Sequence, residues 1–354
     1  MTEMLVSNLR SWRDMFFKLP YYNTAIMASA YASYMRYGSL VLEQYFPVTA
    51  NDDCKFEYQV DGATQHFEVH LPKNFDNTRK YPCIVALHGC MQDADKLVSS
   101  TRINEYADAN GYVVLYPEQD LSENALSCWN WSDPESQKRG TGEPYRIIKG
   151  IDKAIDKYNI DKDNINITGI SAGGALSMAL VCLYPEYFNA VVIHAGLKFN
   201  AADTAIESLI AMGTGIVDND DDFCISKVKN TISGLIFHGT EDKTVNIKNA
   251  NEIISQLSKL NKLISKYPQG NAQTEITAVK PENNKYGYTK IVLSQVDGSS
   301  ILFYKVDGMG HAWSGGKEDL YSDPRGPNAT DIMFKFFEEE YQRKHISHAS
   351  DLHI

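Results

Sequence analysis

The sequence predicts a doubly wound α/β fold, with a mostly parallel sheet covered by helices on both faces. Short, nearly continuous apolar runs recur along the chain, as expected for parallel strands that are buried on both faces. Helical patterns separate these runs, and such alternation is typical of a parallel sheet. An apolar fraction of 43% in 354 residues is enough to bury a large core.

Residues 1–50 are predicted to form a helical extension before the main domain. Apolar residues recur at helical spacing as far as Pro20, where proline ends the pattern. A second helical pattern, rich in Ala, Ser and Tyr, covers roughly residues 24–45. Two interpretations of this extension remain open: a helical pair packed on the main domain, or a surface-binding or lid element.

The main domain is predicted over residues 51–344 and begins with a β-hairpin at a sheet edge. Two alternating stretches, 56–60 and 66–71, flank Asp61-Gly62, a dipeptide typical of a tight hairpin turn. The predicted buried strands follow at 83–89, 112–116, 165–168, 190–194 and 235–238.

The rest of the domain alternates in the same way. Helical patterns separate the strands at 146–158 and 249–263. The polar segment 267–286 is predicted as an insertion before the last strand, 301–306. A helix from Ala329 to about Tyr341 closes the domain, and residues 345–354 are predicted to be a frayed tail.

The acidic run 218–222 places carboxylates at the first, third and fifth positions of a possible calcium loop. Phe223 stands where such a loop needs glycine, and Lys229 stands where it needs a bidentate glutamate. We therefore predict a solvated acidic loop here. Independently of this loop, no metal or organic cofactor is expected for the chain.

The run 164–180 predicts a short buried strand, a sharp turn and a helix. Gly169 and Gly173 flank Ser171 at i−2 and i+2, where side chains would clash as the chain folds tightly. The turn is predicted to raise the Ser171 hydroxyl above the sheet and to make the N–H of Ala172 an oxyanion donor. The alternative is a glycine-rich helix start capped by serine.

A serine hydroxyl needs a base and a third group that orients the base. Asp242 follows the strand 235–238, and His311 follows the last strand, so both are expected at the functional edge of the sheet. Glu241 is the rival of Asp242, but it lies one step off and would point elsewhere. The chain order Ser171, Asp242, His311 is the order found in α/β-hydrolases.

The second oxyanion donor is expected in the loop after the first buried strand. The N–H of Cys90, which follows Gly89, is the candidate. The histidines at other strand ends are interpreted as hydrogen-bonded loop anchors: His88, His194 and His238.

Further loops expected near the site carry recognisable motifs: Leu87–Gln92, Cys128–Trp131, Arg139–Pro144 and Gly310–Gly316. With the triad order, these motifs resemble the esterase family of poly(3-hydroxybutyrate) depolymerases, whose kin are feruloyl and acetylxylan esterases. The resemblance covers about residues 71–337. It implies a serine esterase with Ser171, Asp242 and His311 in the roles described above.

The resemblance also implies a disulfide between Cys90 and Cys128, which match cysteines that are often bridged in this family. The chain carries no clear signal peptide or polymer-binding domain, and so looks most like members that act on a cell's own storage granules. We therefore expect a cytoplasmic or granule-associated protein that contacts granules through residues 1–50. Secretion, as in most of the family, is the alternative.

Trp129, Trp131 and Trp313 lie in loops near the predicted site. Their flat rings could bind a polyester or an aromatic acyl group. The alternative is that they are buried spacers.

Charge and hydropathy limit the class of partner. The formal net charge of −11 argues against nucleic acid and anionic membrane surfaces. The apolar runs are also shorter than a membrane span. We expect a neutral substrate, either a polyester or another ester.

Three functions remain open at this point. The first is a depolymerase of short-chain polyhydroxyalkanoate, and the second is a feruloyl or acetyl esterase of plant polysaccharide. The third is a non-catalytic protein that binds granules or another surface on the same scaffold. The acid released distinguishes the first two, and the absence of turnover would identify the third.

Overall fold

The computed structural model describes residues 54–60, 63–215, 223, 231–265 and 273–351. The chain divides into two compact units, Met1–Asp53 and Cys54–Ile354, and only the second is described. The predicted extension, residues 1–50, and the acidic run 218–222 therefore lie outside the described residues.

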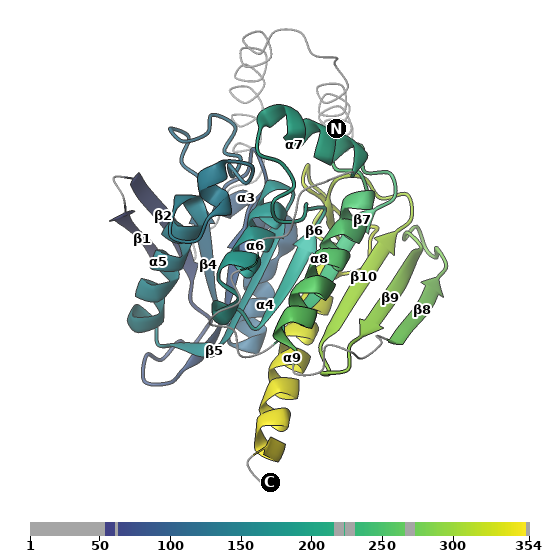
Figure 1. The fold of residues 1–354 in the computed structure, drawn as a ribbon. Helices are drawn as coiled ribbons and strands as arrows, with labels where there is room; N and C mark the ends of the chain where they lie inside the picture. Colours follow the sequence, from purple (N-terminus) through teal and green to yellow (C-terminus); the bar gives the residue numbers. More distant parts are fainter. Residues whose placement is uncertain (1–53, 61–62, 216–222, 224–230, 266–272, 352–354) are drawn as a thin grey trace. The chain divides into compact units, whose positions relative to one another are not determined.

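One ten-stranded sheet runs through this unit (Figure 1). Its strands are β1 Cys54–Val60, β2 Ala63–His70, β3 Tyr81–Leu87, β4 Val113–Glu118, β5 Ile160–Ile170, β6 Ala190–His194, β7 Ser233–Gly239, β8 Gln273–Val279, β9 Tyr288–Ser294 and β10 Ser300–Val306. Their order across the sheet is β1-β2-β4-β3-β5-β6-β7-β10-β9-β8. Every neighbouring pair from β4 to β10 is parallel, and the pairs toward both edges are antiparallel. The predicted mostly parallel sheet is confirmed.

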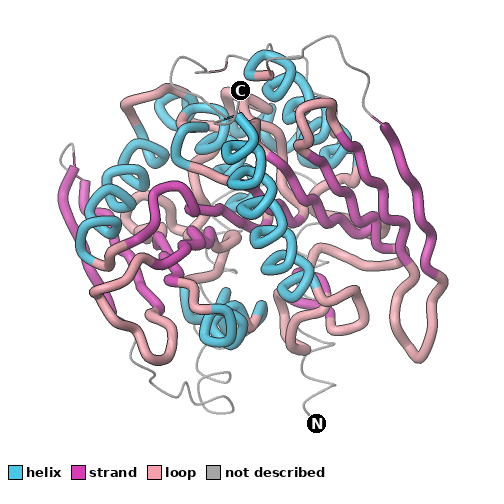
Figure 2. Tube along the Cα trace, turned by 90° about the horizontal axis from the view of Figure 1, so that it is seen from below, coloured by secondary structure: helices cyan, strands magenta, loops and turns pink. Residues whose placement is uncertain are grey.

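Helices cover both faces of the sheet (Figures 1 and 2). They are α3 Ala94–Thr101, α4 Ile103–Asn110, α5 Gly142–Lys157, α6 Ala172–Leu183, α7 Ala205–Thr214, α8 Lys248–Ile264 and α9 Ala329–Asp351, with short 3-10 helices at Pro134–Gln137 and Pro185–Tyr187. Two short strands, β11 Trp313–Ser314 and β12 Ser322–Asp323, pair outside the main sheet.

Each face of the sheet has its own hydrophobic core. On β3, Val85 and Leu87 pack into the core that includes α5, α6 and α8. Their neighbours Ile84 and Ala86 pack into the core that includes α3, α4 and α9. Because alternate side chains enter different cores, the strand has no polar face, and this explains the continuous apolar run in its sequence.

The segment predicted as a polar insertion, 267–286, contains a strand instead. Strand β8 pairs antiparallel with β9 and extends the sheet beyond β10. All residues of β8 are exposed, and even Ile276 is 67% exposed. The strand therefore has no buried face, so its sequence lacks the apolar pattern from which a buried strand is predicted.

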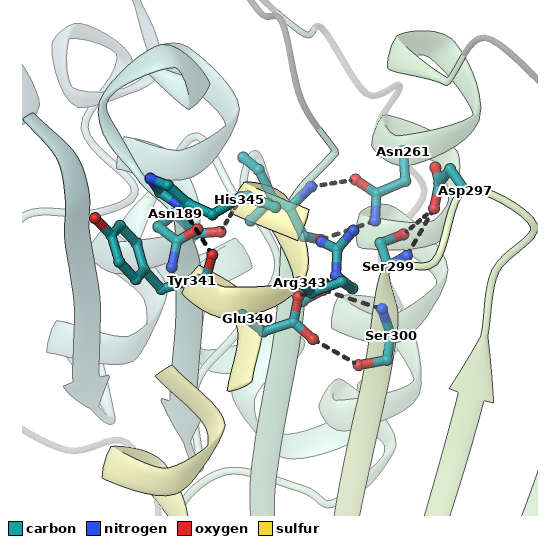
Figure 3. A network of polar contacts seen from close by, with 12 residues as sticks. Asn189, Asn261, Asp297, Ser299, Ser300, Glu340, Tyr341, Arg343 and His345 are labelled. Carbon is teal, nitrogen blue, oxygen red and sulfur yellow. Dashed lines mark hydrogen bonds and ion pairs between the residues drawn. The ribbon is translucent and has the colours of Figure 1, made fainter. Parts of the chain in front are cut away.

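Helix α9 is fixed to the amino ends of β7 and β10 through the buried carboxylate of Glu340 (Figure 3). Ser233 Oγ donates to Glu340 Oε2 at 2.6 Å, and Ser300 Oγ donates to Oε1 at 3.1 Å. Arg343 Nε also donates to Oε2, at 2.8 Å. The helix extends beyond the predicted end near Tyr341, to Asp351. Within the described ranges, no helix is both long and apolar enough to cross a membrane.

Candidate active site

Ser171 occupies a strained turn between β5 and α6. Its φ of 57° lies in the left-handed region, which is costly for a residue that carries a Cβ. The turn also packs tightly, because a Cβ at Gly169 would overlap the carbonyl of Gly173, and a Cβ at Gly173 would overlap that of Leu87. Glycine at both positions therefore allows the sharp change from strand to helix.

The parallel strands bring three predicted residues to one edge of the sheet. Ser171 follows β5, Asp242 follows β7, and His311 follows β10. These strands lie within the run β5-β6-β7-β10, where all neighbours are parallel. Across this edge the N–H of Ser171 donates to the carbonyl of His194 at 2.9 Å. The loops after these strands are thus held side by side.

Asp242 and His311 form a hydrogen-bonded pair. His311 Nδ1 lies 2.7 Å from Asp242 Oδ2, and the other carboxylate oxygen accepts the N–H groups of Thr244 and Val245. Burial by itself raises the pKa of Asp242, but the charges and hydrogen bonds of His311 and His238 together hold it below its ordinary value. The ionised carboxylate accepts a hydrogen bond from the N–H at Nδ1, so the proton of the neutral ring stays on Nδ1 and Nε2 of His311 is able to act as a base.

The rival carboxylate, Glu241, lies elsewhere. Its side chain forms an exposed ion pair with Lys243 at 2.7 Å. The buried His238 supports the Asp242 loop instead: its Nε2 lies 2.9 Å from the carbonyl of Val245 and 3.4 Å from Asp242 Oδ2. His238 is therefore a hydrogen-bonded anchor, as the sequence predicts.

The prediction of the same role for the His194 ring is wrong. The ring is fully buried and stacks between Phe237 and Trp313, with centroid distances of 4.6 and 3.8 Å. Neither ring nitrogen has a hydrogen-bond partner in the described part of the chain. Burial lowers the pKa of His194, so the side chain is neutral and acts as a flat packing group. Only its backbone carbonyl anchors a loop.

The two predicted oxyanion donors, Ala172 and Cys90, have backbone N–H groups for which no acceptor is found in the described part of the chain. Ala172 is the first residue of α6, so its N–H has no acceptor within the helix. Gly89 and Met91 donate their N–H groups, to Gln92 Oε1 and to the carbonyl of Leu126, each at 2.8 Å. The N–H of Cys90 between them makes no such bond among the described residues.

A disulfide joins Cys90 to Cys128, with their Cα atoms 4.1 Å apart. It is the pair implied by the family resemblance. The bridge ties the loop that carries the candidate oxyanion donor to the loop after β4, so the two loops cannot move apart independently.

The structure contradicts a substrate-binding role for Trp129 and Trp313, which are each 1% exposed. Trp129 Nε1 donates to the carbonyl of His88, and Trp313 Nε1 donates to Thr330 Oγ1, both at 3.1 Å. Both rings are buried spacers with satisfied N–H groups. Trp131 is only partly buried, so it keeps some exposed surface, unlike the other two.

A buried polar network of Glu143, Gln119, Asn130 and His88, which sequence reasoning did not predict, contacts the loops of Cys90 and Cys128. Glu143 is 2% exposed and accepts hydrogen bonds from Gln119 Nε2 and from both the backbone and the side chain of Asn130. Gln119 in turn donates its backbone N–H to His88 Nε2. The sequence signal that points to Glu143 is its place in the motif Arg139–Pro144, which by itself says nothing about its partners.

Among the described residues, no group of three or more His, Cys, Asp or Glu side chains is arranged to hold a metal ion. The chemistry that the arrangement supports is acyl transfer: a serine on a strained turn, a histidine oriented by a buried carboxylate, and two free N–H groups.

Comparison with known proteins places the chain in a family. Residues 66–281 match the family described as Esterase PHB depolymerase. Feruloyl esterase B of Neurospora crassa is 29% identical over 273 residues, which cover 72% of this chain and 82% of that protein. Poly(3-hydroxyalkanoate) depolymerase C of Paucimonas lemoignei is 27% identical over 259 residues, which cover 71% of this chain and 58% of that protein.

A solved structure supports the fold. The acetyl xylan esterase from Aspergillus awamori superposes with a TM-score of 0.57 at 20% sequence identity, and the match covers 73% of this chain and 94% of that one.

Proposed function

Because the chain belongs to the Esterase PHB depolymerase family and is a carboxylic ester hydrolase, we propose that it hydrolyses short-chain polyhydroxyalkanoate through Ser171, His311 and Asp242. The observation that carries this proposal is the 2.7 Å contact between His311 Nδ1 and Asp242 Oδ2. This pair lies at the same sheet edge as the strained Ser171.

In the first half of the reaction, Ser171 Oγ attacks the ester carbonyl while His311 Nε2 takes its proton. The N–H groups of Cys90 and Ala172 bind the oxyanion of the tetrahedral intermediate. The carbon–oxygen bond to the leaving alcohol then breaks, and His311 gives its proton to that oxygen. Asp242 stays ionised throughout and stabilises the imidazolium.

In the second half, water attacks the acyl-enzyme and His311 takes one of its protons. The new tetrahedral intermediate collapses, the bond to Ser171 Oγ breaks, and the proton returns to that oxygen. The free acid leaves and the enzyme is restored.

A polymeric aliphatic substrate is supported by the surface of α7. Ile206, Leu209 and Ile210 recur at helical spacing and are 71%, 46% and 52% exposed. Helix α7 lies beyond the carboxyl ends of β6 and β7 (Figure 1), and the carbonyl of Met212 accepts the N–H of Asn246 in the segment after Asp242. An aliphatic stripe beside the site suits adsorption to an apolar polymer.

A second candidate is a feruloyl or acetylxylan esterase. The partly buried Trp131, which packs against the cluster of Ala175 and Val245, could stack on an aromatic acyl group. The feruloyl esterase also shares a larger part of its own length with this chain than the depolymerase does. The non-catalytic alternative is disfavoured by membership in an esterase family.

The compartment and the association with granules remain proposals. The disulfide between Cys90 and Cys128 favours the secreted alternative over a cytoplasmic location, because cytosolic thiols are kept reduced. Granule association through residues 1–50 involves residues outside the described ranges.

The deciding experiment measures 3-hydroxybutyrate released from amorphous polymer granules, with a feruloyl ester as the second substrate. Ser171→Ala should lower turnover by about a millionfold if the triad acts as a unit, whereas the exposed control Ser122→Ala should match the wild type. Release by the wild type alone supports the depolymerase. Cleavage of the feruloyl ester without release from granules favours the second candidate, and full activity of Ser171→Ala would disprove the triad.

A further inference from the structure

We propose that Glu143, acting through Gln119 and His88, positions the N–H of Cys90 for binding the oxyanion. The inference rests on the proposed function, in which Cys90 supplies one of the two oxyanion donors. All three are positioning residues, because they act on the backbone of Cys90 and leave the reacting atoms to the triad.

The neutral ring of His88 carries its proton on Nδ1. Its Nε2 accepts the backbone N–H of Gln119 at 3.1 Å, and an amide N–H can only donate. Nε2 therefore carries no proton, and Nδ1 donates its proton to the carbonyl of Gly89 at 2.8 Å. His88 is 1% exposed, and this burial lowers its pKa to about 4, so the ring stays neutral near pH 7.

The planar peptide bond between Gly89 and Cys90 couples the direction of the Gly89 carbonyl to that of the Cys90 N–H. The carbonyl of Gly89 and the N–H of Cys90 belong to the same peptide unit, and none of the described peptides is cis. In a trans peptide these two groups point in opposite directions. When His88 holds the carbonyl of Gly89, it turns the N–H of Cys90 away from the protein core. Gln92 supports the same peptide, since its N–H also donates to the Gly89 carbonyl, at 3.3 Å.

Gln119, whose backbone N–H contacts His88, is itself held in place by its side chain. Gln119 is 7% exposed, and its side-chain Nε2 donates to Glu143 Oε1 at 2.6 Å and to the carbonyl of Cys128 at 3.0 Å. These bonds fix the residue whose backbone N–H selects the tautomer of His88.

A second route connects Glu143 to Cys90, through Asn130 and the disulfide. Glu143 accepts the backbone N–H and the side-chain Nδ2 of Asn130, each at 2.9 Å. This fixes the loop that carries Cys128, which is bonded to Cys90. One buried carboxylate therefore controls Cys90 from two sides, through the His88 hydrogen bond and through the disulfide.

The test compares Glu143→Gln with Glu340→Gln. Both residues are buried carboxylates that accept three hydrogen bonds, but Glu340 lies at the amino ends of the strands (Figure 3). The readouts are kcat and KM for a soluble p-nitrophenyl ester, and the inhibition constant of an alkyl trifluoromethyl ketone. This ketone forms a tetrahedral adduct with the active serine, and the oxygen of the adduct needs the oxyanion donors.

Glu143→Gln should lower kcat about tenfold, weaken the ketone by a similar factor and change KM less than about twofold. Glu340→Gln should leave all three constants at their wild-type values. If Glu143→Gln does not fold, Gln119→Met replaces it, because this variant keeps the backbone N–H to His88 and the volume of the side chain. A folded variant of either kind that binds the ketone as tightly as the wild type would overturn the proposal.

The Ser171→Ala variant distinguishes a failure of the positioning role of Glu143 from a failure of the proposed function. If Ser171→Ala retains activity, the triad is wrong and the ketone data concern another site. If Ser171→Ala is inactive while Glu143→Gln and Gln119→Met bind the ketone normally, the triad stands and only the positioning role is lost.

Discussion

Nδ1 of His311 lies 2.7 Å from Oδ2 of Asp242, although 69 positions separate them in the sequence. The contact exists because β7 and β10 are parallel neighbours, so the loops that follow them leave the same edge of the sheet. Its chemical result is a histidine held in one tautomer by a buried, ionised carboxylate.

Asp242→Asn should lower kcat by about ten thousandfold, because an amide at this position no longer selects the tautomer of His311 whose Nε2 carries no proton. The measurement is turnover of a soluble ester, with folding checked by circular dichroism. Glu241→Gln is the matched control, since Glu241 contacts the exposed Lys243, and it should keep wild-type activity. Equal losses in the two variants would contradict the assignment of Asp242.

Glu143 should make the free energy of unfolding depend on pH. Burial raises its pKa from 4.5 to about 7, against hydrogen bonds from Gln119 and Asn130 that lower it. The folded state therefore binds the proton more tightly than the unfolded state. The stability from this group is fully present below pH 4.5 and is lost as the pH rises through about 7.

The measurement is urea unfolding of the wild type and Glu143→Gln at pH 4.5 and pH 8. The difference in unfolding free energy between the two proteins should fall by a few kcal/mol, at most about 3, between these values. Subtracting the variant removes the contributions of other titrating groups, such as His88. A difference that is constant or grows with pH would show that the pKa of Glu143 is not raised.

The disulfide should stabilise the folded chain. It spans a sequence separation of 38, for which loop closure predicts about 3–4 kcal/mol. Reduction with dithiothreitol should lower the urea midpoint of the wild type accordingly. The double variant Cys90→Ser, Cys128→Ser should start at the lower midpoint and be insensitive to the reductant. A similar response of both proteins would mean that the reductant acts elsewhere.

Gly173→Ala should destabilise the elbow, because the added Cβ would overlap the carbonyl oxygens of Leu87 and His88. We expect a loss of about 3 kcal/mol or more in unfolding free energy, together with loss of activity. Gly213→Ala is the control in α7, where an added Cβ meets no atom within 4 Å. That change should be neutral or stabilise the helix by up to about 1 kcal/mol.

The aliphatic stripe on α7 should affect the rate of polymer hydrolysis and leave the hydrolysis of soluble esters unchanged. Replacing Ile206, Leu209 and Ile210 together by Gln keeps helix propensity and removes three exposed aliphatic side chains from this face. The rate of 3-hydroxybutyrate release from granules should fall about tenfold as adsorption weakens. Turnover of a soluble p-nitrophenyl ester should not change. A parallel fall in both rates would point to damage at the site itself.

The sequence was sufficient where local chemistry determines the structure. Gly169 and Gly173 flank Ser171 for a steric reason, because the tight turn leaves no room for a Cβ. Asp242 and His311 follow two apolar runs, and the loops after parallel strands meet at one edge of the sheet. The fold and the contact between Asp242 and His311 follow from these local signals.

The sequence was insufficient where burial is decided by distant parts of the chain. Trp129 and Trp313 lie in loops, and nothing in the loops shows that His88 and Thr330 satisfy their N–H groups inside the protein. Glu143 likewise lies in the first turn of a helix, where glutamate is common, and nothing in its local sequence shows that it is buried. Strand β8 was not predicted, because it is held in the sheet by backbone pairing with β9 and buries no side chains that would leave a pattern in the sequence.

Strand β8 also has a consequence for self-association. It ends the sheet with one paired neighbour, so its outer row of N–H and C=O groups can accept a strand from another molecule. The charged residue within Gln273–Val279 is Glu275. In the antiparallel register that sets Glu275 opposite Glu275 of the second molecule, the two carboxylates would repel each other. Within the residues of β8, Glu275 is thus the charge that opposes edge-to-edge growth into fibres.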